Sequence, residues 1–452
     1  MSTIVAISTA PGIGGIGIIR MSGEKSFEIL NKIFVTNDKP IAGYTMKYGK
    51  IVDEKNVIID EVLVSYFVAP NSYTRENVCE INSHGGMVVM KKILELCLKN
   101  GAILAEPGEF TKRAFLNGRI DLSQAEAVID IINSKTDKEA KASINQLEGN
   151  LSLEIKNIRK DLISMMADIE ASIDYPEYDV EEVTTNKVKE VLIKEKDRLI
   201  KLEKSFDNGK ILKDGINTAI IGRPNAGKSS LLNIMLNEER AIVTSVEGTT
   251  RDTIEEYISI NGIPLKIIDT AGIREANDEV EKIGVEKAKK IAKESDLIIG
   301  IFDISRKMNK EDYEILDILK NKNSIIVLNK IDLDENNVDM EKVKEINKPI
   351  VQISTKTREG IENLYKEIEN IIETKEISSD NEIIVTNTRH KSLIIKAMDS
   401  VDKSLETIEN KMPIDIIVVY VKDILENLGE ITGETVTEDI IKEIFSKFCL
   451  GK

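Results

Sequence analysis

Residues 222–229 read Gly-Arg-Pro-Asn-Ala-Gly-Lys-Ser, and they directly follow the apolar run Thr218-Ala219-Ile220-Ile221. The apolar run predicts a strand, and the periodic residues 230–236 predict a helix after the loop. The spacing of Gly222, Gly227, Lys228 and Ser229 is that of a phosphate-binding loop: the glycines let backbone N–H groups converge on phosphates, the lysine reaches the outer phosphates and the serine hydroxyl meets magnesium. We therefore expect nucleotide contacts from Asn225, Ala226, Gly227, Lys228, Ser229 and Ser230.

A second element indicates the base. The apolar run 324–328 predicts a buried strand that leads into Asn329-Lys330-Ile331-Asp332. The Asp332 carboxylate can accept both the N1–H and the exocyclic amino group of guanine, whereas adenine offers neither donor there and would leave a buried charge unpaired. After the predicted strand 350–353 come Ser354, Thr355 and Lys356, which are placed for a backbone contact to the guanine oxygen. The chain is expected to prefer GTP over ATP.

Two further segments complete a GTPase domain. The run Ile267-Ile268 leads into Asp269, Thr270, Ala271 and Gly272, where the carboxylate supports magnesium through water and the Gly272 N–H meets the terminal phosphate. Residue 273 is isoleucine, which cannot orient an attacking water as the glutamine of many small GTPases does. The acidic loop 274–281 offers carboxylates that could position this water, and the alternative is a solvated loop before a helix expected at 284–292. The candidate first switch, with a threonine hydroxyl for magnesium, contributes Thr244, Ser245, Val246, Glu247, Gly248, Thr249 and Thr250.

Length and composition limit what the rest of the chain can be. A chain of 452 residues is long enough for about three domains, and the GTPase elements need only about 215–374. A net charge of −16 disfavours wrapping of nucleic acid through a large basic surface. The three cysteines have no paired short spacing, which argues against disulfides or a zinc site. Without a signal peptide or an uninterrupted apolar span, the chain is expected to be cytoplasmic and not in a membrane.

The segments outside the GTPase elements differ from one another in the spacing of their apolar residues. Residues 1–118 mix strand-like runs with glycine-rich turns and predict an α+β domain. From Ser123 the apolar residues recur with helical spacing, and helices are predicted at 186–206, 388–408 and 414–428. The glycine-rich residues 10–17 are followed by strand residues rather than a helix, which favours a hairpin turn over a dinucleotide-binding loop. Residues 71–76 and 79–86 are polar at a strand end and predict a binding loop whose ligand the chemistry does not identify.

Several motifs together resemble the MnmE (TrmE) family of GTPases that modify the wobble uridine of certain tRNAs. The resemblance covers essentially the whole chain. It rests on the GTPase elements and on Ala10-Pro11-Gly12 with Gly14-Gly15, on the segment Glu106 to Gly118, on Asp121 to Ala127, and on the terminal Cys449-Leu450-Gly451-Lys452. It implies a multidomain α+β, all-α and α/β fold, with a Ras-like GTPase domain inserted into a helical domain. The implied domains are a tetrahydrofolate-binding and dimerisation domain at 1–118, helical parts at 119–212 and 379–452, and the GTPase domain at 213–378.

The resemblance also implies a folate site. It places Arg20, Glu80, Arg119 and Lys452 around the folate, with Arg119 where other members carry lysine, which keeps the charge and alters its geometry. A glutamate tail requires cations and a pterin ring requires a carboxylate, but which residue meets which end stays open. For Cys449 the family suggests a role in the modification, and the alternative is a small buried side chain.

The resemblance further implies how hydrolysis proceeds without the glutamine. Family members hold a potassium ion in place of an arginine finger, which corresponds here to Asn225, Thr244, Val246 and Thr249, with magnesium on Ser229 and Thr250 and the water on Glu281. The cation neutralises charge that grows in the transition state. The potassium site is expected to be complete when two GTPase domains meet.

The function expected from this resemblance is GTP-dependent installation of an aminomethyl or carboxymethylaminomethyl group at C5 of uridine 34. The one-carbon donor is 5,10-methylenetetrahydrofolate or 5-formyltetrahydrofolate, and an MnmG-like partner subunit brings FAD and NADH. The expected assembly is a homodimer that forms a heterotetramer with this partner and acts on tRNA. The alternatives are a ribosome-assembly or regulatory GTPase acting as a switch on RNA, and a folate-binding scaffold with incidental GTP affinity. The chain lacks a basic domain after the GTPase elements, which disfavours the first, and its complete magnesium and switch elements disfavour the second.

Overall fold

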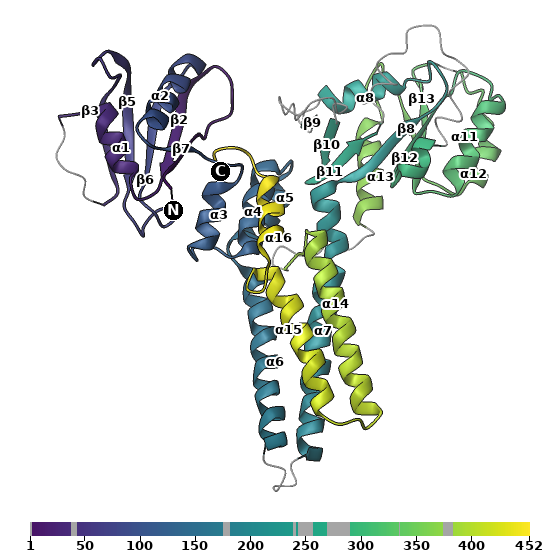
Figure 1. Cartoon of the computed structure of the whole chain (residues 1–452). Helices are drawn as coiled ribbons and strands as arrows, with labels where there is room; N and C mark the ends of the chain where they lie inside the picture. The colour runs from purple at the N-terminus through teal and green to yellow at the C-terminus, as the bar shows by residue number, and fades with distance from the viewer. Residues whose placement is uncertain are drawn as a thin grey trace. The chain divides into compact units, whose positions relative to one another are not determined.

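The computed structural model describes residues 2–37, 43–174, 181–237, 241–242, 256–268, 290–333, 335–373 and 383–452. The chain divides into two compact units (Figure 1). Unit 1 comprises residues 1–129, 147–188 and 400–452, and unit 2 comprises residues 130–146 and 189–399. Both the N-terminal and the C-terminal residues of the chain therefore belong to unit 1.

A seven-stranded sheet and several helices form unit 1. The strand order is β3-β4-β5-β6-β2-β1-β7. The strands are β1 (Ile4–Ile7), β2 (Gly14–Ser22), β3 (Phe34–Val35), β4 (Thr45–Val52), β5 (Ile58–Phe67), β6 (Val78–Gly85) and β7 (Ile103–Leu104). The helices lying mainly in this unit are α1 (Ser26–Ile33), α2 (Met87–Lys99), α3 (Glu109–Leu116), α4 (Leu122–Asn133), α6 (Asn150–Asp174), α15 (Asp415–Thr432) and α16 (Glu438–Ser446).

Over β4 and β5, one face of the sheet of unit 1 is covered and the other carries exposed side chains, whereas β1 buries side chains on both faces. Strand β5 alternates, so that Val62, Val64 and Tyr66 are buried while Leu63 between them is exposed, as the period of two in a strand requires. The buried side chains pack with apolar residues of α1 and α2 into one core. Strands β1 and β2 pair antiparallel, which confirms the predicted hairpin at the glycine-rich residues.

Helical packing completes unit 1. Helix α6 buries Leu151, Ile155, Ile158 and Leu162, a spacing of three and four residues that forms one apolar stripe, and it packs against α15. Near the C-terminus, α16 joins α4 in a separate apolar cluster that includes Leu122 and Phe445. This cluster anchors the end of the chain within unit 1.

A second seven-stranded sheet forms the centre of unit 2, in the order β14-β13-β12-β8-β11-β10-β9. The strands are β8 (Ile216–Ile221), β9 (Ala241–Ile242), β10 (Glu256–Ile260), β11 (Ile263–Ile267), β12 (Leu297–Asp303), β13 (Ser324–Asn329) and β14 (Ile350–Ile353). The helices are α5 (Asp137–Leu147), α8 (Lys228–Asn237), α11 (Lys310–Lys320), α12 (Met340–Glu345) and α13 (Ile361–Glu373). Helices α7 (Glu181–Asp214) and α14 (Thr388–Glu409) each run from one unit into the other.

The parallel strands of this sheet decide where a ligand lies. Strands β11, β8, β12, β13 and β14 run parallel to one another. Strands β8, β12 and β13 are buried along nearly their whole length, as expected for a sheet covered on both faces. In such sheets ligands bind beyond the carboxyl ends of the strands. The predicted fold class, with α+β, helical and α/β parts, is confirmed.

Among the residues that the structure describes, no helix combines the length and the apolar character needed to cross a bilayer.

Candidate functional site

The phosphate loop connects β8 to α8. Asn225 and Gly227 have φ angles of 61° and 108°, a backbone conformation that glycine adopts readily and that other residues adopt at a cost. A Cβ on Gly227 would collide with the side-chain amide of Asn329, so glycine is required there by both conformation and space. The loop ends at the first turn of α8, where Lys228, Ser229 and Ser230 stand, and unsatisfied N–H groups at a helix start favour bound anions.

Lys228 lies inside this loop. Its Nζ donates to the backbone oxygens of Gly222 and Arg223, both at 2.8 Å. Burial lowers the pKa of Lys228, because the charged ammonium is partly removed from water. The bonds to two carbonyls hold the ammonium in the loop, and a bound phosphate would supply an opposite charge.

The start of the base-recognition element is fixed by Asn329. This fully buried side chain donates from Nδ2 to the oxygen of Ala226 at 2.8 Å and to Oγ1 of Thr355 at 3.2 Å. Its Oδ1 accepts from the backbone N–H of Thr355 at 3.0 Å. One side chain therefore ties the phosphate loop to the segment after β14, and the sequence-predicted residues from three strand ends converge.

The residues for guanine follow Asn329. Ser354 donates from Oγ to Oδ1 of Asp332 at 2.7 Å, and Nζ of Lys356 is 4.0 Å from Oδ2 of the same carboxylate. These contacts orient the Asp332 carboxylate. A carboxylate held in this way can accept the paired N–H donors of guanine.

Lys330 is held by Asp303, a residue that was not predicted from the sequence to belong to the site. Lys330 adopts a φ of 73°, and its Nζ donates to Oδ2 of Asp303 at 2.5 Å. Burial opposes ionisation of Asp303, but the hydrogen bonds from Lys330 and Ser305 outweigh it and lower the pKa of Asp303. The signal available in the sequence was an aspartate at the carboxyl end of an apolar run, beside two motif-bearing strands.

The remaining predicted nucleotide residues lie outside the part of the chain that the structure describes. They are Thr244, Ser245, Val246, Glu247, Gly248, Thr249, Thr250, Asp269, Thr270, Ala271, Gly272 and Glu281. Their roles stay predictions.

A second group of polar residues gathers in unit 1. Arg20 on β2 stands directly opposite Glu80 on β6, and its Nε donates to Oε1 of Glu80 at 2.8 Å. The guanidinium carbon of Arg20 lies 5.9 Å from the ring centre of Tyr73 and 5.7 Å from that of Phe110. The ion pair thus has aromatic rings beside it.

The C-terminal tail reaches the same place. The oxygen of Gly451 accepts from Oγ of Ser8 at 3.0 Å and from NH1 of Arg20 at 3.4 Å. The oxygen of Lys452 accepts from the N–H of Phe110 at 3.2 Å. Gly451 has a φ of 87°, and a Cβ there would meet the oxygen of Ile7, so the tail passes too close to β1 for any other residue.

Arg119 is connected to this group through Tyr73. Its guanidinium carbon lies 4.8 Å from the ring centre of Tyr73, within the range of a cation–π interaction, and the Tyr73 hydroxyl is 3.0 Å from Oγ1 of Thr111. The structure therefore brings together Arg20, Glu80, Arg119 and the backbone of Lys452. Cys449 is exposed, and its oxygen accepts from the N–H of Gly108 at 3.3 Å. Tyr73 belongs to the predicted binding loop 71–76, and the structure places it beside Arg20. Phe110 was missed, since no local pattern marks it as a neighbour of Arg20.

This arrangement offers a carboxylate, guanidinium groups and aromatic rings in one place. A planar heterocycle with N–H donors matches the carboxylate and the rings, and a carboxylate-bearing chain matches the guanidinium groups. The group is thus chemically suited to a molecule with both parts.

Family models and similar proteins match nearly the whole chain. Residues 122–449 match the family model described as the MnmE helical domain, and residues 3–119 match that of the GTP-binding protein TrmE N-terminus. The tRNA modification GTPase MnmE of Acetivibrio thermocellus is 54% identical over 458 residues, covering 100% of this chain and 99% of the relative.

Two other relatives carry the same name. The protein of Clostridioides difficile (strain 630) is 51% identical over 456 residues, and that of Thermoanaerobacter sp. (strain X514) is 50% identical over 457 residues. Each comparison covers 100% of this chain and 99% of the relative. With a phosphate loop and a guanine-recognition element on parallel strand ends and relatives this similar along the whole chain, the protein belongs to the MnmE (TrmE) family of tRNA modification GTPases.

Proposed function

We propose that the chain is a cytoplasmic enzyme that hydrolyses GTP and modifies C5 of uridine 34 in certain tRNAs. It acts with an FAD-dependent, MnmG-like partner subunit that uses NADH, and together they install an aminomethyl or carboxymethylaminomethyl group. A folate, 5,10-methylenetetrahydrofolate or 5-formyltetrahydrofolate, supplies the one-carbon unit. Support comes from the family and from two separate sites on one chain, one suited to GTP and one suited to a folate.

The observation that carries the folate assignment is the contact of the C-terminal tail with Arg20 beside Glu80. A folate joins a pterin with N–H donors to a glutamate with carboxylates. Glu80, held by Arg20 at 2.8 Å, is suited to the pterin donors, and Arg119 and Lys452 supply cations for the glutamate. Because the tail carries Cys449 as well, an exposed thiol belongs to the segment that Arg20 holds.

Support for a homodimer comes from the open face of the sheet in unit 1. Met46, Tyr48 and Leu63 are 60%, 57% and 44% exposed, and Tyr48 and Leu63 stand opposite each other on β4 and β5. Contiguous apolar side chains on an open sheet face mark an interaction surface more often than a surface that meets only water. A second copy of the chain covers this face in our proposal.

The cation sites are proposed from the phosphate loop. Asn225 would hold potassium with Thr244, Val246 and Thr249, and Ser229 would hold magnesium with Thr250. The donors fit, since amide, hydroxyl and backbone oxygens suit both ions, and Asn225 is on the loop that holds Lys228. Potassium supplies a positive charge near the phosphates, and Glu281 orients the water. Turnover is expected to be much higher in potassium than in sodium at matched ionic strength, and equal turnover in both salts would remove potassium from the proposal.

The folate assignment is tested with Glu80→Gln, which keeps the shape of the side chain and removes its charge. The expected result is a loss of folate affinity by about tenfold to hundredfold, because hydrogen bonds to charged groups contribute roughly 1.5–3 kcal/mol. The matched control is Glu28→Gln, which removes a carboxylate from an exposed pair with Lys32 on α1. Folate affinity is measured by calorimetry and GTP turnover by phosphate release.

Both variants are expected to hydrolyse GTP at the rate of the unaltered chain. If Glu80→Gln binds folate as tightly as Glu28→Gln does, this site does not bind folate.

A further inference from the structure

The segment 303–312, from the last residue of β12 to the first turn of α11, touches both halves of the nucleotide site. At its start, Asp303 holds Lys330 of the base-recognition element at 2.5 Å. At its end, Oδ2 of Asp312 accepts from NH1 of Arg223 in the phosphate loop at 3.1 Å. Two carboxylates of one segment therefore each hold a residue of a different nucleotide-binding motif.

Asp312 is fixed in place by the helix that it begins. Asn309 is the N-cap of α11, and its side chain accepts from the N–H groups of Glu311 and Asp312 while Oδ2 of Asp312 accepts from the N–H of Asn309 at 2.9 Å. The Asp312 side chain is only 9% exposed. A carboxylate held in a capping box has little freedom to follow a moving partner, so it acts as a fixed point for the guanidinium.

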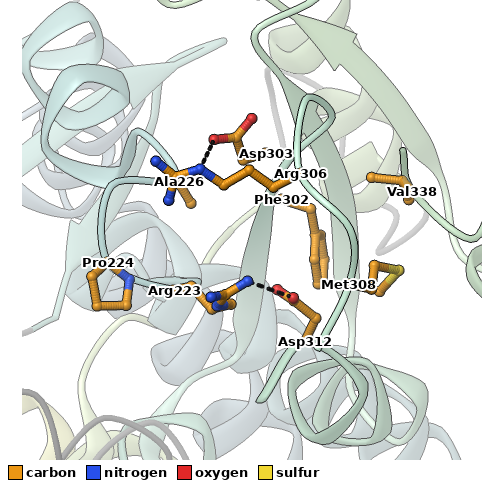
Figure 2. A pocket seen from close by; sticks show the side chains of 9 residues that line it. All are labelled: Arg223, Pro224, Ala226, Phe302, Asp303, Arg306, Met308, Asp312 and Val338. Carbon is orange, nitrogen blue, oxygen red and sulfur yellow. Dashed lines mark hydrogen bonds and ion pairs between the residues drawn. The ribbon is translucent and has the colours of Figure 1, made fainter. Parts of the chain in front are cut away.

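Arg223 connects this fixed point to Lys228. Its guanidinium turns toward Asp312 across a small cleft (Figure 2), and its Nε is 3.5 Å from Oε2 of Glu311. Its backbone oxygen accepts from Nζ of Lys228 at 2.8 Å and from the N–H of Ala226 at 3.3 Å. The side chain is thus held outside the loop while the carbonyl points to the lysine inside it.

The geometry of Arg223 argues against direct stabilisation of a transition state and favours positioning of the phosphate loop. An arginine that stabilises a transition state directs its guanidinium at the transferring phosphate, whereas that of Arg223 is paired with Asp312. The residue after it is Pro224, which restricts the backbone of Arg223 as well. With both the side chain and the backbone constrained, the direction of the Arg223 carbonyl is set.

We propose that Asp312, acting through Arg223, is a positioning residue for the phosphate loop. The pair sets the carbonyl that orients the Lys228 ammonium, so that the loop is arranged for phosphates before the nucleotide arrives. This inference rests on nucleotide binding at the loop. It predicts that loss of the pair weakens GDP and GTP alike, since both carry the phosphates that the lysine reaches.

The test uses Asp312→Asn, whose side-chain oxygen can still accept from Asn309 while its charge is gone. Arg223→Met removes the partner, and Glu314→Gln is the control because it removes a carboxylate from an exposed pair with Lys310 on the same helix. The affinity for GDP and the unfolding temperature of the nucleotide-free protein are measured for each full-length variant. Asp312→Asn and Arg223→Met are expected to bind GDP about 5- to 30-fold more weakly, while the control binds normally.

A double-mutant cycle separates positioning from a general structural effect. Asp312→Asn combined with Arg223→Met should weaken GDP binding no more than either change alone, because both break one interaction, and Arg223→Lys should restore part of the affinity. Normal GDP affinity in Asp312→Asn, or additive losses in the double variant, would overturn the inference. So would a fall in the nucleotide-free unfolding temperature that fully explains the lost affinity. Failure of the unaltered chain to bind GDP would overturn the nucleotide site itself, and the inference with it.

Discussion

Replacement of Gly451 by alanine tests how the C-terminal tail serves the site in unit 1. A Cβ at this position would meet the oxygen of Ile7 and lie 2.9 Å from Cα of Ser8. Both are backbone atoms of, or beside, a strand in the sheet, so they cannot move aside as a flexible side chain would. In addition, an alanine at a φ of 87° carries a conformational cost of about 1–2 kcal/mol.

The C-terminal tail would have to shift to relieve this collision. The Gly451 oxygen would then lose its hydrogen bonds from Ser8 at 3.0 Å and Arg20 at 3.4 Å. At about 0.5–1.5 kcal/mol for each bond, the docked tail is destabilised by roughly 1–3 kcal/mol. If folate requires the docked tail, its affinity falls by about tenfold to hundredfold.

The control is Gly101→Ala. Gly101 also has a positive φ, 106°, but a Cβ there has nothing within 4 Å, so this variant carries the conformational cost without the collision. Folate affinity by calorimetry and GTP turnover are measured on both variants. Only Gly451→Ala is expected to lose folate affinity, and both should retain GTP turnover. Folate affinity in Gly451→Ala equal to that of Gly101→Ala would refute the proposed part of the tail in the site.

Three other predictions concern the nucleotide site. Asp332→Asn should reverse the preference for GTP over xanthosine triphosphate by on the order of 10²-fold, because an amide can donate to the O2 of xanthine; competition binding checks this. Lys228→Met should abolish tight GDP binding and stabilise the nucleotide-free protein. Burial lowers the pKa of Lys228 in the folded protein. The free-energy cost of burying the charged ammonium is therefore fully present below the folded pKa and is relieved as pH rises from the folded toward the unfolded pKa. Unfolding curves measured against pH test this sign. Glu281→Ala should lower turnover by about 10² to 10⁴ with nearly unchanged nucleotide affinity, and normal turnover would transfer the role to another carboxylate, such as Glu279.

The nucleotide site could be predicted from the sequence to the extent that its parts are local. Each motif directly follows an apolar run, and those runs are the strands β8, β13 and β14. Parallel strands end at one edge of a sheet, and this is why Asn225, Asn329 and Thr355 lie close together. The bonds of Asn329 to Ala226 and Thr355 show that convergence.

Contacts between distant or unpatterned residues could not be predicted in this way. Asp303 and Asp312 carry no motif, and their partners are chosen by the path of the loop between them. The tail meets Arg20 across 431 residues of sequence, and that contact was expected only from the family resemblance. The apolar cluster of Leu122 and Phe445 that anchors the tail has no local signature either.

Helix ends were also predicted incompletely. The helix expected at 186–206 spans Glu181–Asp214, because the apolar spacing weakens at both ends while its charged residues are still good helix formers. Helix α16 was not predicted as a helix. It is short, and its apolar residues are defined by packing against α4.

The central claim is that this chain is needed to modify the wobble uridine. The most direct measurement is mass spectrometry of tRNA nucleosides from cells that lack the chain, with the unaltered chain and Glu80→Gln each returned to them. We predict that uridine 34 stays unmodified at C5 in cells without the chain. The unaltered chain should restore the aminomethyl or carboxymethylaminomethyl group, and Glu80→Gln should restore it poorly. The same modification at full level in cells without the chain would show that the chain is not needed for it.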